Sequence, residues 1–350
     1  AVWPSTGNYC RGGAFNSRLL GAQGVAILPA EMSQERFDWL HEIGAEVIAT
    51  PGCESNVKEI FDKTNELKQD PQYMIFNQFE EMGNPLWHYN VTGNALADVY
   101  EAIKRPGDRF AGAAFTSGSA GTMSAGDLLK EKYPHLKLAV GEALQCPTIL
   151  ENGFGGHRIE GIGDKHIPWI HNDDEDSQRL LRLFNTPEGQ AYLKNELHLD
   201  DELIEKLTWL GISGIANVLC CIKMAKYYEF TERDVVGTVL TDSAVMYGSR
   251  IQELNDQYGA YNAHEAAMDH ALHMLGLKLD NMQELTYADR KRVHNLKYYT
   301  WVEQQGKTVE ELNALWYDTE GTWDTVHAQA KDLDDLINAF NEATGLLKDL

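Results

Sequence analysis

The first part of the chain alternates between short apolar runs and segments in which apolar residues recur at helical spacing. Val25–Pro29 is an apolar run that predicts a buried strand. Ser33 then precedes a predicted helix and suits its N-cap, and Phe37 and Leu40 fall on one face of that helix. A second apolar run follows at residues 45–50. A strand, a helix and a strand joined by short turns form a βαβ unit, which implies a parallel sheet covered on both faces.

The same alternation returns further along the chain. Apolar runs predict strands at residues 110–115, 138–141 and 235–240, and helical patterns follow Gly121 and cover residues 215–227. We therefore expect an α/β fold with doubly wound parallel sheets. In such folds, ligands bind at the carboxyl ends of the strands.

The pattern changes near Ile251, after which helical spacing dominates. Four helices joined by short polar turns are predicted at residues 263–275, 287–304, 309–316 and 333–347. We interpret residues 1–250 as an α/β catalytic core and residues 251–350 as a helical C-terminal extension. The extension is expected to pack on the core or on a second subunit.

Charge and cysteine content narrow the classes of function. The chain has 30 Lys and Arg residues against 53 Asp and Glu residues, a formal charge of −23, which repels the phosphates of nucleic acid. No apolar run approaches the ~20 residues of a membrane helix, and no signal peptide is recognisable, so we expect no membrane association. The five cysteines are scattered without CxxC spacing, which indicates a reducing compartment. We expect a cytoplasmic protein.

One group of histidines has a spacing that could indicate a metal site. His270 and His273 share a helix face, as metal ligands often do, and His264 and Asp269 are near in sequence. No convincing fourth ligand accompanies them. We therefore predict no metal site and interpret them as surface or packing residues.

A loop of small residues, Thr116–Thr122, lies directly after an apolar run and before a helix. Small residues let consecutive backbone N–H groups approach an anion, and a helix N-terminus adds partial positive charge. The loop is neither a Walker A loop nor a dinucleotide-binding GxGxxG motif. Plain tight turns are also built from small residues, so the loop alone leaves both interpretations open.

Two further turns also follow apolar runs. Ser5–Asn8 offers hydroxyl and amide groups suited to a carboxylate, and Thr241–Ser243 offers a hydroxyl that could meet a heterocyclic nitrogen. Either turn alone could be a helix cap. Together with the Thr116–Thr122 loop they point to one edge of the sheet, which strengthens the prediction of a site there.

The residues of these segments, and their order along the chain, resemble those of fold type II pyridoxal-phosphate enzymes, the tryptophan synthase β-like superfamily. The nearest resemblance is to the cysteine synthase and cystathionine β-synthase family, and it runs co-linearly over residues 1 to about 250. The segments that carry it are Ser5–Asn8, Asn77–Phe79, Gly118–Thr122 (with Ser-Ala where Thr-Gly is usual), Gly161–Gly163, Gly211–Gly214 and Thr241–Ser243.

The resemblance implies a seat for pyridoxal 5'-phosphate. Asn8 would bind the ring hydroxyl of the cofactor and Ser243 its ring nitrogen. The cofactor phosphate would be held by Gly118, Ser119, Ala120, Gly121 and Thr122. The substrate would be held by Ser5, Thr6, Gly7, Gln78 and Gly161.

The resemblance also implies a reaction and a partner. We expect β-replacement on a serine- or cysteine-like amino acid through an aminoacrylate, carried out by a homodimer. β-Elimination with release of a keto acid and ammonia is the alternative. A non-catalytic cofactor-binding or regulatory subunit is the alternative of another class.

One departure from the family concerns a lysine. In relatives, a lysine before the Ser-Gly-Asn loop forms the Schiff base with the cofactor. Only seven residues precede Asn8, and none is a lysine. We therefore expect no catalytic residue in this chain and place the Schiff-base lysine upstream of Ser5. Two alternatives stay open: a lysine on a separate subunit, or binding without catalysis. Lys165 is interpreted as an ordinary surface residue.

Overall fold

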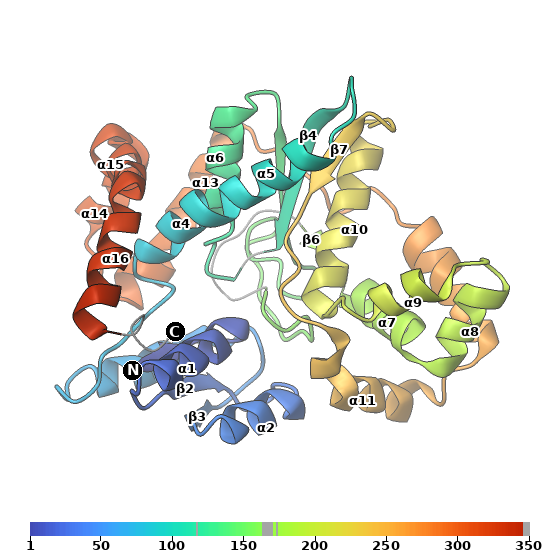
Figure 1. The fold of residues 1–350 in the computed structure, drawn as a ribbon, viewed down its shortest axis with the longest axis horizontal. Helices are drawn as coiled ribbons and strands as arrows, with labels where there is room; N and C mark the ends of the chain where they lie inside the picture. Colours follow the sequence, from blue (N-terminus) through green and yellow to red (C-terminus); the bar gives the residue numbers. More distant parts are fainter. Residues whose placement is uncertain (117, 163–170, 173, 346–350) are drawn as a thin grey trace.

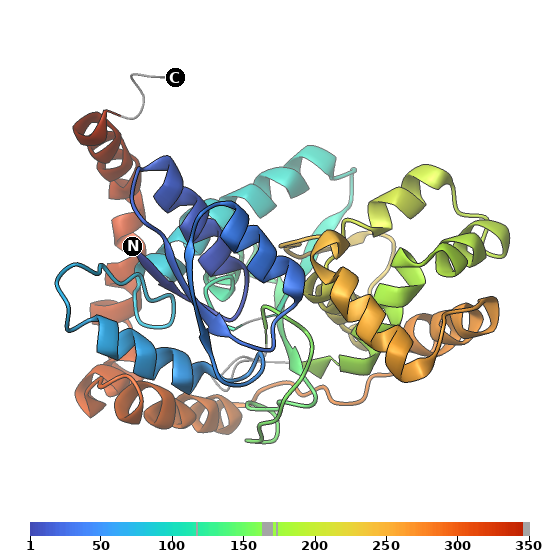
Figure 2. The same ribbon diagram turned by 90° about the horizontal axis from the view of Figure 1, so that it is seen from below.

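The computed structural model describes residues 1–350 apart from 117, 163–170, 173 and 346–350. Its described part contains two parallel sheets that belong to separate lobes, with helices on both faces of each sheet (Figure 1). A second view, turned by 90°, shows the amino-terminal lobe in blue in front of the second lobe (Figure 2). The predicted α/β class and the parallel arrangement are confirmed.

The amino-terminal sheet has the order β1-β2-β3. Its strands and helices are β1 (Val2–Pro4), α1 (Asn8–Leu19), β2 (Val25–Pro29), α2 (Gln34–Glu42), β3 (Glu46–Thr50) and α3 (Val57–Leu67). Successive side chains of the central strand point to opposite faces. Ala26 and Leu28 therefore pack with Leu40 of α2, whereas Val25 and Ile27 pack with α3.

The second sheet has the order β6-β5-β4-β7. Its strands are β4 (Arg109–Thr116), β5 (Lys137–Ala143), β6 (His171–Asn172) and β7 (Asp234–Gly237), and the helices around it are α4 (Gly83–Trp87), η1 (His88–Thr92), α5 (Gly93–Ile103), α6 (Met123–Lys132) and α10 (Ile212–Tyr227). Ala113 and Phe115 of β4 pack against α5 and α6. Ala114, on the opposite face, packs against α10. The alternation along β4 thus explains the helices on both sides of this sheet.

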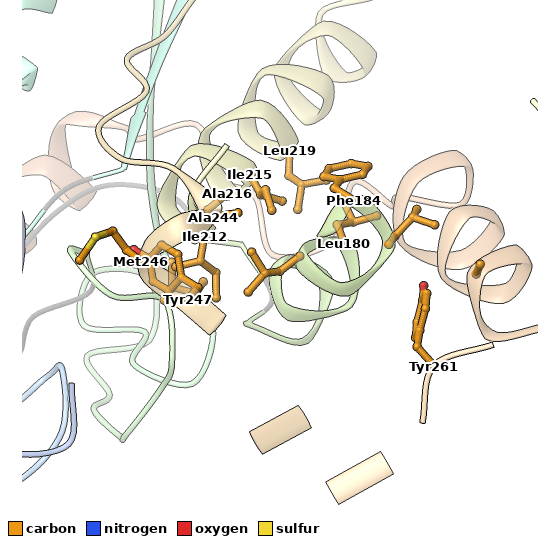
Figure 3. Close-up of a cluster of buried hydrophobic side chains, with 14 of the residues drawn as sticks. Leu180, Phe184, Ile212, Ile215, Ala216, Leu219, Ala244, Met246, Tyr247 and Tyr261 are labelled. Atoms are coloured by element: carbon orange, nitrogen blue, oxygen red, sulfur yellow. The ribbon is translucent and has the colours of Figure 1, made fainter. Parts of the chain in front are cut away.

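The largest apolar cluster joins α10 to a group of helices beside the second sheet (Figure 3). These helices are α7 (Asp174–Asn185), α8 (Pro187–Asn195), α9 (Asp201–Leu207), η2 (Ala244–Tyr247), α11 (Gly248–Tyr258), α12 (Ala263–Asp269) and η3 (His270–Leu275). Leu180 and Phe184 of α7 lie beside Ile215 and Leu219 of α10 in this cluster. Tyr247 of η2 is fully buried within it. The cluster therefore anchors the turn that carries Thr241–Ser243 to α10.

The last helices run beside the amino-terminal lobe and α4, drawn in orange to red (Figures 1 and 2). They are α13 (Tyr287–Lys297), η4 (Tyr298–Glu303), α14 (Val309–Tyr317), η5 (Glu320–Asp324), α15 (Thr325–Ala328), η6 (Gln329–Asp332) and α16 (Leu333–Thr344). The helical character expected after Ile251 is present. The division of the chain at residue 250 into two domains stays a prediction.

Three local expectations differ from the structure. The last predicted strand ends at Gly237 and not at residue 240. Strand β6 was not predicted, because two residues carry no readable pattern and their conformation depends on pairing with β5. Ser33 occupies the N-cap of α2, but its side chain makes no cap hydrogen bond; its hydroxyl donates instead to Glu160 Oε2 at 2.8 Å.

Within the described ranges, no single helix is both long and apolar enough to cross a membrane. The helices α9 and α10 reach that length and composition only as a pair bent by 108°.

Candidate active site

A cavity of about 310 Å³ lies where loops from both lobes meet. Its volume falls at the lower end of the range of small-molecule sites, ~300–1,000 Å³. It is lined by Ser5, Thr6, Gly7, Asn8, Tyr9, Gln78, Asn84, His88, Phe115, Thr116, Gly118, Ser119, Ala120, Gly121, Thr122, Gly161, Ile162, Ser213, Asn217, Val239 and Thr241. The cavity thus lies at the carboxyl ends of β1 and β4, where a doubly wound fold places its ligands.

Eleven of the twelve residues predicted to bind cofactor or substrate line this one cavity: Ser5, Thr6, Gly7, Asn8, Gln78, Gly118, Ser119, Ala120, Gly121, Thr122 and Gly161. Ser243 is the exception. It precedes the short helix η2, and the wall of the cavity next to it is formed by Thr241. The predicted contact of Ser243 with a ring nitrogen stays a prediction. Ser117, Gly163 and Lys165, named in the sequence analysis, lie outside the described residues.

The Gly118–Thr122 loop, which we call the anion loop, has a backbone built to present N–H groups. Ala120 has a φ of 65°, a left-handed conformation that costs a non-glycine residue ~1–2 kcal/mol. Among the described residues, no acceptor is recorded for the backbone N–H groups of residues 119–122. The helix α6 starts directly after the loop, so its positive end faces the same place. A small phosphate ester fits such a loop.

Gly121 is held closely against the segment from residues 84 to 88. A Cβ atom added at Gly121 would lie 2.5 Å from Asn84 Oδ1 and 2.8 Å from His88 Cδ2. Asn84 Nδ2 in turn donates to Ser119 Oγ at 3.0 Å and to the Gln78 carbonyl at 3.1 Å. Burial lowers the pKa of His88, so its ring is neutral at pH 7 and adds no positive charge to the loop. The loop therefore relies on backbone dipoles and hydroxyls.

The loop Ser5–Asn8, which we call the carboxylate loop, connects β1 to α1. The N–H of Gly7 donates to Ser5 Oγ at 2.9 Å, which turns the chain before α1 begins at Asn8. A Cβ atom on Gly7 would come within 2.9 Å of the Cα atom of Gly161. Gly161 itself has a φ of +94° and donates its N–H to Glu54 Oε1 at 2.7 Å. Close backbone contact between the two segments therefore depends on glycine at position 7.

A buried group of charges lies beneath the carboxylate loop. Arg36 Nη2 is 3.1 Å from Glu160 Oε2 and 3.6 Å from Asp242 Oδ2, and all three side chains are at most 3% exposed. Arg250 Nε adds a second ion pair to Glu160 at 2.8 Å. Burial, followed by the nearby Asp242 carboxylate, raises the pKa of Tyr247 well above its usual value. Its hydroxyl therefore stays protonated and donates to Asp242 Oδ2 at 2.8 Å.

Sequence reasoning missed seven polar residues of the cavity wall, which were not predicted as ligands: Tyr9, Asn84, His88, Thr116, Ser213, Asn217 and Thr241. Asn217 comes from the middle of the apolar helix α10, where no local pattern marks it. Ser213 and Thr241 lie inside motifs that carried the family resemblance. Their position in those motifs was the one signal that could have identified them.

No lysine is among the described residues that line the cavity. A second cavity of about 520 Å³ shares Gln78, Ser119 and Ala120 with the first and is lined by Lys130 and Lys297. Burial lowers the pKa of Lys297 to about 8. The described residues contain no group of three or more His, Cys, Asp or Glu side chains arranged to hold a metal ion.

Comparison with known proteins identifies the family. The family model described as "Pyridoxal-phosphate dependent enzyme" matches residues 1–242. The chain belongs to this family. It is 34% identical over 247 residues to a cysteine synthase of Staphylococcus aureus strain N315, which covers 70% of this chain and 74% of the relative. It is 30% identical over 230 residues to cysteine synthase B of Campylobacter jejuni, covering 65% of this chain and 71% of the relative.

Solved structures share the fold at lower identity. An O-acetylserine dependent cystathionine beta-synthase from Helicobacter pylori superposes with a TM-score of 0.56 at 24% identity, covering 71% of this chain and 76% of that one. A hydrogen sulfide-producing enzyme from Fusobacterium nucleatum gives a TM-score of 0.57 at 22% identity, covering 77% and 76%. The predicted fold type II family and its cofactor, pyridoxal phosphate, are therefore confirmed.

Proposed function

We propose that the cavity between the lobes seats pyridoxal 5'-phosphate and that the protein catalyses β-replacement on a small serine- or cysteine-like amino acid. The observation that supports this most strongly is the anion loop: the N–H groups of residues 119–122 have no acceptor in the described part of the chain, and the loop shares one cavity with the carboxylate loop. A phosphate group and an amino-acid carboxylate would thus have separate places in the same cavity.

The anion loop would hold the cofactor phosphate. The N–H groups of residues 119–122 and the hydroxyl of Thr122 would be the donors at this place, and Asn84 Nδ2 donates to Ser119 Oγ beside them. Because the φ of Ala120 is positive, its neighbouring N–H groups can converge on one anion, as in a backbone nest. When bound, the cofactor supplies the electron sink for loss of the β-substituent.

The carboxylate loop and Gln78 would hold the substrate. Helix α1 begins at Asn8, so its positive end lies at this loop. Gln78 Nε2 donates to the Pro4 carbonyl at 3.4 Å, which directs its amide toward the start of the loop. A carboxylate placed here would receive N–H and O–H donors, and the guanidinium groups of Arg36 and Arg11 behind Asn8 would add positive charge. Such a site suits a small zwitterion.

A second candidate, a cofactor-binding protein without catalysis, is favoured by one observation: no described lysine lines the cavity. β-Elimination, the other reaction considered, would use the same seat. β-Replacement, β-elimination and binding without catalysis differ in whether bound pyridoxal phosphate is linked to a lysine and in which product is formed.

The test has two stages. The full chain is titrated with pyridoxal 5'-phosphate, reduced with borohydride and mapped by peptide mass spectrometry. It is then given O-acetylserine with sulfide, or cysteine alone, and cysteine and pyruvate are measured. Cysteine formation from O-acetylserine supports β-replacement, and pyruvate from cysteine supports β-elimination. Cofactor binding with neither product supports the non-catalytic candidate, and absence of binding contradicts all three.

A further inference from the structure

The amide of Asn8 is surrounded by groups that allow only one orientation. Its Oδ1 accepts hydrogen bonds from Arg36 Nη1 at 3.0 Å and from Arg11 Nη1 at 3.2 Å. Guanidinium groups donate and cannot accept. If the amide were flipped, two donors would face its NH₂ group. The oxygen of the Asn8 amide must therefore point toward the arginines.

The nitrogen of the same amide is oriented from the other side. Asn8 Nδ2 donates to Asp242 Oδ2 at 2.9 Å. An amide NH₂ has two hydrogens, and no second acceptor for Asn8 Nδ2 is recorded among the described residues. Since Asn8 lines the cavity, this second N–H is available to an acceptor on a bound ligand.

Arg36 is the group that connects these contacts. It lies on α2 with a fully buried side chain and reaches Asn8, Glu160 and Asp242 at once. Its Nε also donates to Glu160 Oε2 at 3.2 Å. Glu160 directly precedes Gly161 of the cavity wall, and Asp242 directly follows Thr241. One guanidinium group thus links three segments that line the cavity.

Nearby carboxylates explain how the charged side chain of Arg36 can be buried beneath the cavity. Glu160 and Asp242 supply two negative charges, and Arg36 and Arg250 supply two positive charges. Arg11, the second donor to Asn8, is stacked over Trp39 at 4.6 Å, and its Nε has no hydrogen-bond partner among the described residues. Glu253 also pairs with Arg250 at 2.8 Å, and Arg11 places one more positive charge beside the Asn8 amide oxygen. This charge polarises the amide and strengthens its free N–H as a donor.

We propose that Arg36 is a positioning residue, which fixes the Asn8 amide so that its free N–H donates to the ring hydroxyl of pyridoxal phosphate. This inference rests on the proposed function, because it requires the cofactor in this cavity. It goes beyond that function by assigning a role to a residue that touches neither cofactor nor substrate.

The experiment measures binding of aldehyde-free probes, so that no lysine chemistry contributes. The probes are 4'-deoxypyridoxine 5'-phosphate, its analogue without the ring hydroxyl, and inorganic phosphate. Isothermal titration calorimetry is carried out on the full wild-type chain, Arg36→Met and Arg36→Lys. Arg179→Met is the matched control, because Arg179 pairs with Glu175 and stacks over Tyr258 away from the cavity. Arg36→Lys keeps the charge but loses the forked geometry, and it serves where Arg36→Met fails to fold.

We expect both Arg36 variants to weaken the hydroxyl-bearing probe about tenfold or more, the loss typical of a hydrogen bond to a polarised donor. The hydroxyl-free probe and inorganic phosphate should change by no more than about twofold, as a random amide orientation affects neither. A general structural role would weaken both ring probes equally, and that result overturns the inference. Equal binding of both ring probes by the wild type also overturns it, while the proposed function stands. Failure of the wild type to bind any probe contradicts the proposed function itself.

Discussion

Asn217 binds the end of strand β4 through Thr116: its Oδ1 accepts a hydrogen bond from the Thr116 N–H at 2.6 Å. The same side chain donates through Nδ2 to the Val239 carbonyl at 2.8 Å. Asn217 is 4% exposed, and of the two residues that it binds, Thr116 is buried and Val239 is half-buried. One amide thus connects the segment that leads into the anion loop with the segment that leads to Thr241.

Substitution of Asn217 tests this link. We expect Asn217→Ala to lower the free energy of unfolding by about 1–3 kcal/mol, because the buried Thr116 N–H and the half-buried Val239 carbonyl both lose their partner. Urea denaturation measures the change. Asn295→Ala, at an exposed position of α13, is the control and should change stability by less than about 0.5 kcal/mol. Equal effects in the two variants would show that the link contributes nothing.

Gly121 should tolerate no side chain. Because an added Cβ atom would lie 2.5 Å from Asn84 Oδ1, we expect Gly121→Ala to displace the anion loop. Binding of pyridoxal phosphate and of inorganic phosphate should weaken about tenfold or more, since the N–H groups no longer converge. Calorimetry measures both. Gly12→Ala is the control, as nothing lies within 4 Å of a Cβ atom there, and unchanged binding by Gly121→Ala would contradict the close contact.

Ala120 offers the opposite prediction, a stabilising change to glycine. Its φ of 65° is strained for alanine and free for glycine, so Ala120→Gly should raise the free energy of unfolding by about 1 kcal/mol. Ala125→Gly, in the buried interior of α6, is chemically the same change and should lower it by about 1 kcal/mol or more. Thermal or urea denaturation measures whether each substitution raises or lowers the free energy of unfolding. Destabilisation by both substitutions would mean that Ala120 carries no strain.

His273 makes stability depend on pH. Its Nδ1 lies 2.5 Å from Asp176 Oδ1, and its Nε2 lies 3.9 Å from Asp269 Oδ1. The hydrogen bond with Asp176, followed by the charges of Asp176 and Asp269 and opposed by burial, raises the pKa of His273. A raised pKa in the folded state means that this stabilisation is complete below the unfolded value of about 6.5 and is lost as pH rises through the folded value.

The pH dependence is tested by comparing the stability of wild type and His273→Gln in urea denaturation. The measurements are made at about pH 5.5 and at about pH 9, below and above the pH range in which the stabilisation by His273 is lost. The variant should be less stable at the lower pH, and the difference should shrink at the higher pH. His264→Gln, at an exposed position, should show no such trend. A difference that grows with pH would contradict the assigned ion pair.

The strands and the cavity loops were predictable because each depends on local pattern. Apolar runs mark β2, β4 and β5, and small residues after β4 mark the anion loop. The carboxyl ends of parallel strands then bring such loops together without further information. The contacts that position the side chains were not predictable. Arg36 looks like any charged residue of a surface helix, because its partners Glu160 and Asp242 lie more than 120 residues away.

Thr241 and Ser243 also show what could not be predicted from the sequence, in this case for two residues of one turn. Both are hydroxyl residues in one turn, so composition gives no reason to choose between them. In the structure Thr241 lines the cavity, whereas Ser243 precedes η2, which is anchored through buried Tyr247. That anchoring depends on contacts with α7 and α10, and the residues of the turn alone do not predict those contacts.

The wall of the cavity is drawn from residues as far apart as Ser5 and Thr241, and local unfolding of either lobe therefore destroys the site. By mass action, a ligand that binds only the intact site shifts the unfolding equilibrium of both lobes together. Its contribution is about 2.7 kcal/mol at a free concentration 100 times its dissociation constant. Supply of cofactor should thus govern the lifetime of the chain against proteases, because proteolysis acts on the open form.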